Sequence, residues 1–254
     1  MYRCGETVVR VGATFRDVGD VAWCSAVAAA VARRVPEAIA PMPTADGRLA
    51  AGVSGRPVSL WPFVPGLPGD DADPNQRRRA AHLLARVHAA LAGVTVAVTP
   101  RRRMPAAPVP DLHDPALDTW LEEYGEPTPQ LIHGDFYADN VITDDRGTVI
   151  ALIDWDEAAF GSAEKELAGA AWEWGRCRES LDLTPARRFV DDYAAAGGTA
   201  DRLDDTALRQ LIRARVRDEI AYDRATAASR SADAEDEDDE YQRLQVRAFT
   251  ELRP

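Results

Sequence analysis

Polar residues that could bind a metal and accept a proton concentrate in one stretch of the 254-residue chain. His133, Gly134 and Asp135 are consecutive, and Asn140 follows after four further residues. Asp154 comes later, directly after an apolar run. An amide oxygen beside a carboxylate suits Mg²⁺, which takes one or two protein carboxylates and completes its shell with water and substrate phosphates. A further carboxylate held off the metal can accept the proton of a hydroxyl group, so the stretch predicts phosphoryl-transfer chemistry.

The elements around these residues predict how they meet. Val141–Thr143 and Thr148–Ile153 are expected strands, joined by a turn of Asp, Asp, Arg and Gly. A hairpin brings the residue after its second strand back beside the residue before its first. We therefore expect Asn140 and Asp154 to approach one another, with Asp135 nearby.

The wider chain divides into three parts. Residues 1–61 are expected to form a small β-rich lobe, residues 62–69 a Pro/Gly-rich hinge, and residues 70–254 a mostly helical lobe. In the first part, Asp20 is the expected cap of a helix. The elements expected there are Thr7–Val11, Ala22–Arg34, Arg48–Val53 and Pro57–Trp61. The helices expected in the last part are Asn75–Leu91, Pro115–Tyr124, Glu164–Arg178, Pro185–Ala196, Asp204–Ala227 and Tyr241–Leu252.

Charge and hydropathy exclude several classes of partner. The formal net charge is −12, and the run 231–240 contains seven acidic residues and no basic one. Nucleic acid is therefore not an expected partner, because phosphate backbones are bound by basic surfaces. No apolar stretch approaches the roughly 20 residues of a membrane span, and no signal peptide is apparent at the start. We expect a cytoplasmic protein with no membrane partner.

The same residues carry a family resemblance. His-Gly-Asp, four residues, Asn and then Ile-Asp-Trp resembles the aminoglycoside phosphotransferase and choline kinase group of the protein-kinase-like superfamily. Leu83–His88, Phe160-Gly161 and Glu166–Ala168 are similar to further segments of that family, which usually has Asp-Leu-Ala at the last of them. The resemblance implies an α+β, two-lobed protein-kinase-like fold with a small β-rich N-lobe and a large helical C-lobe. It also implies a kinase that uses ATP and Mg²⁺ to phosphorylate a hydroxyl group of a small molecule.

Roles follow from the resemblance residue by residue. Asp135 looks like the catalytic base, and Asn140 and Asp154 look like the Mg²⁺ ligands. His133 resembles the structural histidine that braces this loop. For Asp156, contact with a second metal or the substrate and a helix-capping role both stay open.

The N-lobe departs from the family pattern. Arg10 is the candidate for the basic residue that contacts the ATP phosphates, because the only lysine, Lys165, lies elsewhere. The helix expected over 22–34 contains no acid to hold Arg10, so Asp20 or Asp17 is the candidate partner, with Asp20 preferred.

The start of the chain is short for this fold. Only nine residues precede Arg10, whereas a kinase-like N-lobe places two strands and a phosphate-covering loop there. Residues 4–6 are expected to form only a turn. We expect a truncated N-lobe, either because the start is internal to the gene or because the natural lobe is trimmed. The hinge residues Pro62, Phe63 and Val64 are expected nucleotide contacts by the same resemblance.

The phosphate acceptor is less constrained. The helical region 182–219 would wall its site by resemblance, and its acids suit a cationic substrate such as an aminoglycoside or an amino alcohol. A homoserine-like alcohol or another natural product stays open. The alternative function is a pseudokinase or ligand-binding module that has lost productive ATP binding. The acids concerned are Asp191, Asp192, Asp201, Asp204, Asp205, Asp218 and Glu219.

Overall fold

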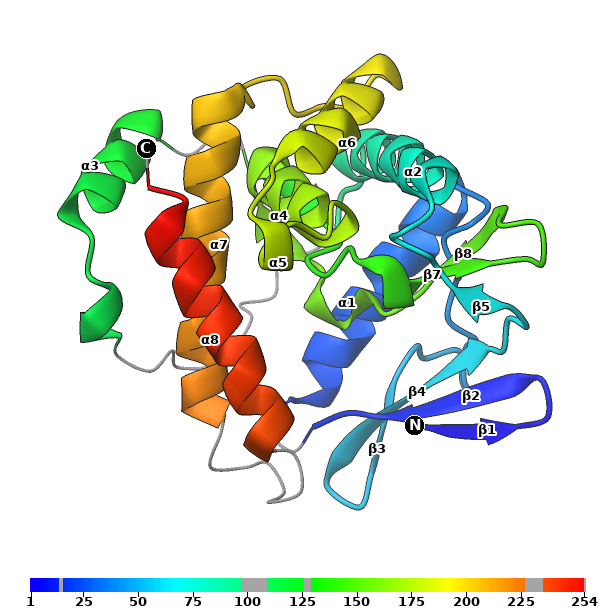
Figure 1. Cartoon of the computed structure of the whole chain (residues 1–254). Coiled ribbons are helices and arrows are strands. Elements are labelled where there is room, and N and C mark those ends of the chain that lie inside the picture. The colour runs from blue at the N-terminus through cyan, green and yellow to red at the C-terminus, as the bar shows by residue number, and fades with distance from the viewer. Residues whose placement is uncertain (14–15, 97–108, 126–128, 227–234, 254) are drawn as a thin grey trace.

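The first part of the chain builds a four-stranded antiparallel sheet with the order β1-β2-β4-β3. A computed structural model describes residues 1–13, 16–96, 109–125, 129–226 and 235–253, so the beginning of the acidic run, 231–234, lies outside the described residues. Figure 1 shows this sheet apart from the main group of helices. The strands are β1 (Tyr2–Cys4), β2 (Thr7–Val11), β3 (Ala51–Val53) and β4 (Arg56–Pro62).

Strand β1 corrects one expectation. Residues 4–6 were expected to form only a turn, yet Tyr2–Cys4 pairs with β2 through a two-residue connection at Gly5-Glu6. Gly5 has a φ of 59°, a conformation that glycine adopts readily in such hairpins. All three residues of β1 are exposed, so the sequence has no alternation of apolar and polar residues that would predict this strand.

Helix α1 (Val18–Ala32) begins earlier than its sequence pattern predicts. The cap is Asp17, whose carboxylate accepts a hydrogen bond from the backbone N–H of Asp20 at 2.7 Å. Asp20 is therefore not the cap, and lies buried in the first turn of the helix. After α1 the chain joins the two lobes, because the backbone around Glu37–Ile39 exchanges hydrogen bonds with Leu152.

The connection to the large lobe follows β4. The short strand β5 (Leu67–Pro68) already pairs with the large lobe, through β7 (Val141–Thr143). Strand β7 in turn pairs with β8 (Val149–Leu152), and β6 (Gln130–Ile132) pairs with β9 (Ala159–Gly161). The hairpin of β7 and β8 thus lies where the sheet part and the helical part meet (Figure 1).

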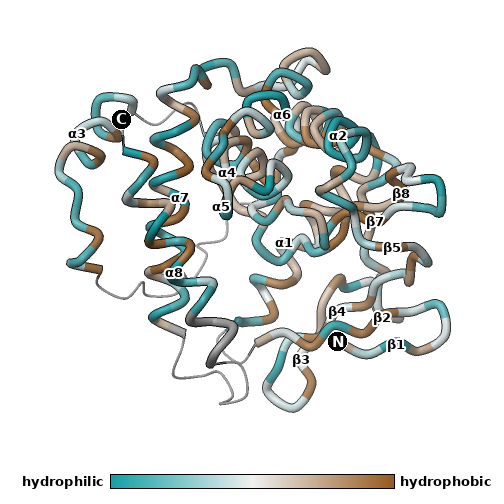
Figure 2. The backbone as a smooth tube through the Cα atoms, in the orientation of Figure 1, coloured by the Kyte–Doolittle hydropathy of each residue, from teal (hydrophilic) through white to brown (hydrophobic). Residues whose placement is uncertain are grey.

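Helices form most of the large lobe. Helix α4 contacts α2, α6 and α7, and Trp155, Trp172 and Trp174 are fully buried. Figure 2 shows apolar and polar stretches alternating along α7 and α8, the pattern of helices with one buried face. Among the described residues, no helix is both long and apolar enough to cross a membrane. The helices are α2 (Pro74–Ala92), α3 (Pro115–Tyr124), α4 (Ala163–Trp174), α5 (Cys177–Ser180), α6 (Thr184–Ala195), α7 (Asp205–Thr226) and α8 (Glu235–Glu251).

Candidate active site

The β7–β8 hairpin brings Asn140 and Asp154 together, as their spacing predicts. Val141 is paired with Leu152, and the backbone N–H of Ile153 donates to the carbonyl oxygen of Asn140 at 2.9 Å. Asp154 is the next residue along the chain. Asn140 directly precedes β7, and Ile153 alone separates Asp154 from the end of β8. Both strands are largely buried, which fixes the positions of the two residues.

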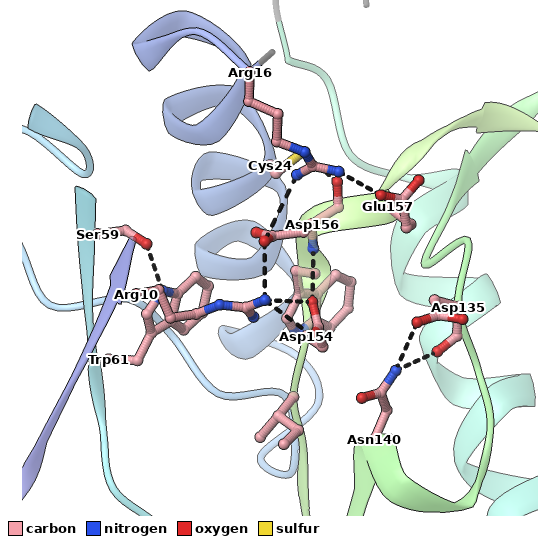
Figure 3. Close-up of polar contacts among 12 residues, drawn as sticks. Arg10, Arg16, Cys24, Ser59, Trp61, Asp135, Asn140, Asp154, Asp156 and Glu157 are labelled. Carbon is pink, nitrogen blue, oxygen red and sulfur yellow. Dashed lines mark hydrogen bonds and ion pairs between the residues drawn. The ribbon is translucent and has the colours of Figure 1, made fainter. Parts of the chain in front are cut away.

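Asn140 also holds Asp135. Its amide nitrogen donates to the main-chain oxygen of Asp135 at 2.8 Å and to the carboxylate Oδ2 at 3.0 Å. The amide oxygen is therefore turned away from Asp135, as Figure 3 shows. This oxygen and the Asp154 carboxylate form a donor set of the kind that Mg²⁺ takes when water and phosphate oxygens complete its shell. The described residues contain no cluster of three or more acidic, His or Cys ligands, so the donor set fits a shared Mg²⁺ better than a closed metal cage.

Asp154 has an unusual backbone conformation. Its φ and ψ of 59° and 65° lie in the left-handed region, which aspartate tolerates better than most residues. The carboxylate caps the short 3₁₀ turn Trp155–Glu157. Such strained residues cluster at functional sites.

Arg10 reaches Asp154 from the small lobe. One terminal nitrogen, Nη2, lies 2.8 and 2.9 Å from the two carboxylate oxygens of Asp154 and 2.9 Å from Oδ2 of Asp156. Arg16, from the segment before α1, lies 3.6 Å from Asp156 and pairs with Glu157 (Figure 3). These pairs correct the expectation that Asp20 holds Arg10. Asp20 is buried in α1, whereas the Arg10 side chain crosses to the large lobe.

Asp156 therefore takes a role that its sequence position did not reveal. It binds arginines from two segments of the small lobe, and the cap of the 3₁₀ turn is Asp154. The hinge residues lie elsewhere: the N–H of Phe63 donates to the carbonyl of Glu6 at 2.8 Å, and the Arg3 guanidinium covers the Phe63 ring. Pro62 and Val64 flank Phe63 at the end of β4.

Asp135 is a half-buried carboxyl group at the wall of a cavity. Burial raises its pKa to about 6, Arg215 opposes the rise, and the negative charge of Asp154 adds to it. A carboxylate with a pKa near 6 is ionised at neutral pH and is a stronger proton acceptor than an ordinary aspartate. Its environment therefore suits a general base.

His133 braces the loop that carries Asp135. The ring is fully buried, with Nε2 3.0 Å from the carbonyl oxygen of Ile153 and Nδ1 accepting the N–H of Asp135 at 3.3 Å. Gly134 has a φ of 88°, and a Cβ atom there would overlap the carbonyl of Glu157. Only glycine fits this position without moving the turn that follows Asp154.

Glu166 is a supporting residue to which the sequence analysis gave no role, although it belongs to a segment that carries the family resemblance. Its buried carboxylate accepts hydrogen bonds from the backbone N–H groups of His133, at 3.1 Å, and Gly134. His88 Nε2 lies 2.7 Å from the same carboxylate, and His88 Nδ1 lies 2.7 Å from the hydroxyl of Tyr193. Burial opposes ionisation of Glu166, but the hydrogen bond with His88 keeps its pKa below the usual value. A histidine on the apolar face of α2 was the signal in the sequence.

The cavity beside Asp135 has a volume of about 460 Å³. Its walls come from the loop after His133 and from α4, α5, α7 and α8. Of the seven acids predicted to wall the acceptor site, Glu219 lines this cavity. Its charged and aromatic lining residues are Asp135, Phe136, Tyr137, Asp139, Lys165, Glu166, Glu173, Arg178, Arg215, Glu219 and Tyr241.

Comparison with known proteins identifies the family. Residues 3–211 match the model of the phosphotransferase enzyme family. The chain belongs to this family. Its fold has the two lobes and the α+β architecture that the resemblance predicted, and solved kinases share it.

Relatives of known structure share the fold at low sequence identity. An amicoumacin kinase solved with AMP-PNP, Ca²⁺ and Ami is 12% identical, with a TM-score of 0.68, over 98% of this chain and 83% of the other. A choline kinase from Streptococcus pneumoniae is 12% identical, with a TM-score of 0.64, over 96% of this chain and 86% of the other. A microcompartment-associated aminopropanol kinase is 16% identical, with a TM-score of 0.64, over 97% of this chain and 82% of the other.

One curated relative matches over a shorter stretch. A hygromycin-B 4-O-kinase from Escherichia coli is 42% identical over 77 residues, which is 30% of this chain. The matched stretch spans 22% of the length of that kinase.

Proposed function

We propose that the protein transfers the γ-phosphoryl group of ATP to a hydroxyl group of a small molecule. Asp135 is the base that orients the hydroxyl and accepts its proton, and Asn140 and Asp154 are the Mg²⁺ ligands. Bound Mg²⁺ supplies charge neutralisation at the phosphates. The observation that carries the proposal is the meeting of Asp135, Asn140 and Asp154 at one end of the β7–β8 hairpin.

The small lobe supplies the nucleotide contacts in this proposal. Arg10 binds phosphate oxygens, because its guanidinium already lies beside the carboxylate proposed for the metal. Residues 62–69 are the hinge between lobes 1–61 and 70–254, and Pro62, Phe63 and Val64 contact the nucleotide. Asp156 remains ion-paired with Arg10 and Arg16 and holds the small lobe against the hairpin.

The acceptor binds in the cavity beside Asp135. Asp139, Glu173 and Glu219 line that cavity and favour an acceptor that carries an amine. The kinases of similar structure include an aminopropanol kinase and a choline kinase, whose named substrates combine a hydroxyl with a cationic nitrogen. Amino alcohols and aminoglycosides are therefore the first compounds to test.

A second candidate function is a pseudokinase that binds a ligand without transferring phosphate. The ion pair of Arg10 favours it, because one nitrogen contacts both oxygens of the carboxylate that would bind the metal. For catalysis, Arg10 has to release Asp154 when nucleotide and metal enter. A lasting ion pair would leave the protein without productive ATP binding.

Thermal melting with ATP and Mg²⁺ separates the two functions. For a kinase, ATP with Mg²⁺ raises the melting temperature more than ATP with EDTA, and Asp154→Asn removes the difference. Asp145→Asn is the matched control, because Asp145 is exposed in the turn of the same hairpin. Equal stabilisation of the parent protein with and without Mg²⁺ would support the pseudokinase.

A further inference from the structure

Arg215 presents a cationic group to the cavity that contains Asp135. Its Nε donates to the carboxylate of Glu219, one turn further along α7. Within the described parts of the chain, its two terminal nitrogens have no hydrogen-bond partner, and the side chain keeps 44% of its surface exposed. The stem of the side chain lies beside Gly169 of α4, at ordinary van der Waals distance from the position that a Cβ atom would take there. The guanidinium thus has free donors in an otherwise walled space.

Charge is distributed unevenly along this cavity. Arg215 and Asp135 both line this cavity. Lys165, the only lysine of the chain, also lines the cavity. One helical turn beyond Gly169 and Arg215 lie the acids Glu173 and Glu219, roughly 5 Å along each helix. Two basic groups, Arg215 and Lys165, thus share this cavity with Asp135. Of the two acids one turn further on, Glu173 is paired with Arg178 at 2.7 Å.

This arrangement suits a different acceptor from a simple cation. A guanidinium with free terminal nitrogens binds a carboxylate or similar oxyanion through parallel hydrogen bonds. A polycation would bring positive charge against Arg215 and Lys165. A molecule with an anionic group at one end and an amine at the other would suit both the basic and the acidic groups.

We propose that Arg215 binds an oxyanion of the phosphate acceptor, so that the acceptor is a zwitterionic alcohol. A carboxylate close to the reacting hydroxyl contacts Arg215, and an amine contacts Glu173 and Glu219. This inference rests on the proposed kinase function and adds a substrate class to it. The γ-phosphate of ATP is another oxyanion that enters near Asp135, and the test below separates the two sources.

Three pairs of compounds that differ only in a carboxylate test the proposal. They are L-serine and ethanolamine, L-threonine and 1-aminopropan-2-ol, and L-homoserine and 3-aminopropan-1-ol. ATP consumption is measured with Mg²⁺ for the parent protein, Arg215→Gln and Arg217→Gln. Arg217 is the matched control, because it lies on the same helix and pairs with Asp118 of α3. Glu219 keeps a donor in Arg215→Gln, since Gln245 Nε2 lies 3.1 Å from its Oε2.

The expected result is a preference of at least tenfold in kcat/KM for the carboxylate member of one pair or more. Arg215→Gln should reduce this preference to less than about twofold, and Arg217→Gln should retain it. Preference for the amines that lack a carboxylate, or consumption of none of the six compounds, would overturn the proposal. Relative to the parent protein, Arg215→Gln could lose more affinity for ATP than for ADP while its acceptor preference stays unchanged. That result would assign Arg215 to the γ-phosphate and would also overturn the proposal.

Binding of ATP to the parent protein is measured alongside. If ATP with Mg²⁺ does not bind, the kinase function itself fails. If it binds and the pairs show no carboxylate preference, only the assignment of Arg215 fails. The melting temperature of each variant is measured as a control for retention of the fold.

Discussion

Asp135 and Asn140 show how single side chains prepare the site. The Asn140 amide nitrogen binds Asp135 and so directs its own oxygen away from that residue. One residue thereby orients the proposed base and presents a proposed metal ligand. Asp135 and Asn140 are five residues apart, and a short 3₁₀ turn at Ala138–Asn140 ends at Asn140. The sequence predicted that Asp135 lies near Asn140, but not this hydrogen bond.

Asp135→Asn tests the base. Positioned proton acceptors contribute roughly 10²–10⁴-fold to rate, so kcat should fall by about that factor. The affinity for ATP should change little, because Asp135 contacts Asn140 and the cavity and has no contact with Arg10. Steady-state kinetics and calorimetric ATP binding measure the two effects. A normal rate combined with a loss of ATP affinity would make Asp135 a nucleotide-binding residue.

Glu166→Gln tests the support of the catalytic loop. The carboxylate accepts hydrogen bonds from two backbone N–H groups and lies beside His88, and glutamine offers one acceptor oxygen with an NH₂ group directed at a donor. We expect a loss of about 1–3 kcal/mol in the free energy of unfolding, the cost of unsatisfied buried groups. A fall in kcat larger than the rise in KM should accompany it. Unchanged denaturant unfolding would show that Glu166 does not hold the loop.

At the scale of elements, strand β2 and the hairpin meet through Arg10. Its position opposite Ser59 in β4 places the side chain on the face that meets the large lobe. The sequence predicted β2 to the residue. Arg10 was its candidate for the phosphate contact because the only lysine of the chain lies elsewhere. It did not predict Asp154 and Asp156 as partners of Arg10. These acids follow Arg10 by 144 and 146 positions in the sequence, and such distant contacts depend on how the lobes pack.

Arg10→Ala should act on nucleotide and metal in opposite directions. ATP affinity should fall by more than adenosine affinity, because adenosine has no phosphates for Arg10 to bind. Mn²⁺ alone should bind more tightly than to the parent protein, since both oxygens of Asp154 lose their ion-pair partner. Calorimetry with ATP and adenosine, and electron paramagnetic resonance with Mn²⁺, measure these changes.

Arg48→Ala is the control for that experiment, because Arg48 pairs with Asp46 in an exposed turn. Equal losses for ATP and adenosine would contradict a phosphate contact of Arg10. Unchanged Mn²⁺ affinity would contradict the competition between Arg10 and metal for Asp154.

At the scale of the whole molecule, a buried ion pair connects three helices. Asp114 caps α3 and lies 2.5 Å from Arg213 of α7, which also donates to the carbonyl of Phe249 in α8 at 3.0 Å. The sequence predicted α3 to the residue and α7 to within one residue at each end, but it placed the start of α8 at Tyr241, whereas the helix begins at Glu235. It gave no sign of the ion pair, or of Arg215 reaching the neighbourhood of Asp135, because long-range pairing has no local periodicity.

Asp114→Ala should reduce the free energy of unfolding by about 3–5 kcal/mol at pH 7, the cost of removing one partner of a buried pair. Burial alone would raise the pKa of Asp114, but the hydrogen bond from Arg213 lowers it below its usual value. The stabilisation is therefore present above about pH 4 and is lost as the pH falls through the lowered pKa.

The difference in the free energy of unfolding between the parent protein and Asp114→Ala should thus become smaller in acid. Denaturant unfolding at pH 7 and at pH 3 measures it. Asp118→Ala, which breaks a partly exposed pair between α3 and Arg217 of α7, should cost no more than about 1 kcal/mol. A difference that grows on acidification would contradict the ionised state of Asp114.

The most direct test of the account is whether the protein makes a phosphate ester. ³¹P nuclear magnetic resonance of ATP, Mg²⁺ and a mixture of amino alcohols, hydroxyamino acids and aminoglycosides would follow the γ-phosphate. The account predicts a phosphomonoester signal that requires the parent protein and Mg²⁺. The signal should persist with Asp145→Asn, disappear with Asp154→Asn and form roughly 10²–10⁴-fold more slowly with Asp135→Asn. ATP that binds but yields no phosphomonoester, or a signal unchanged by Asp154→Asn, would contradict it.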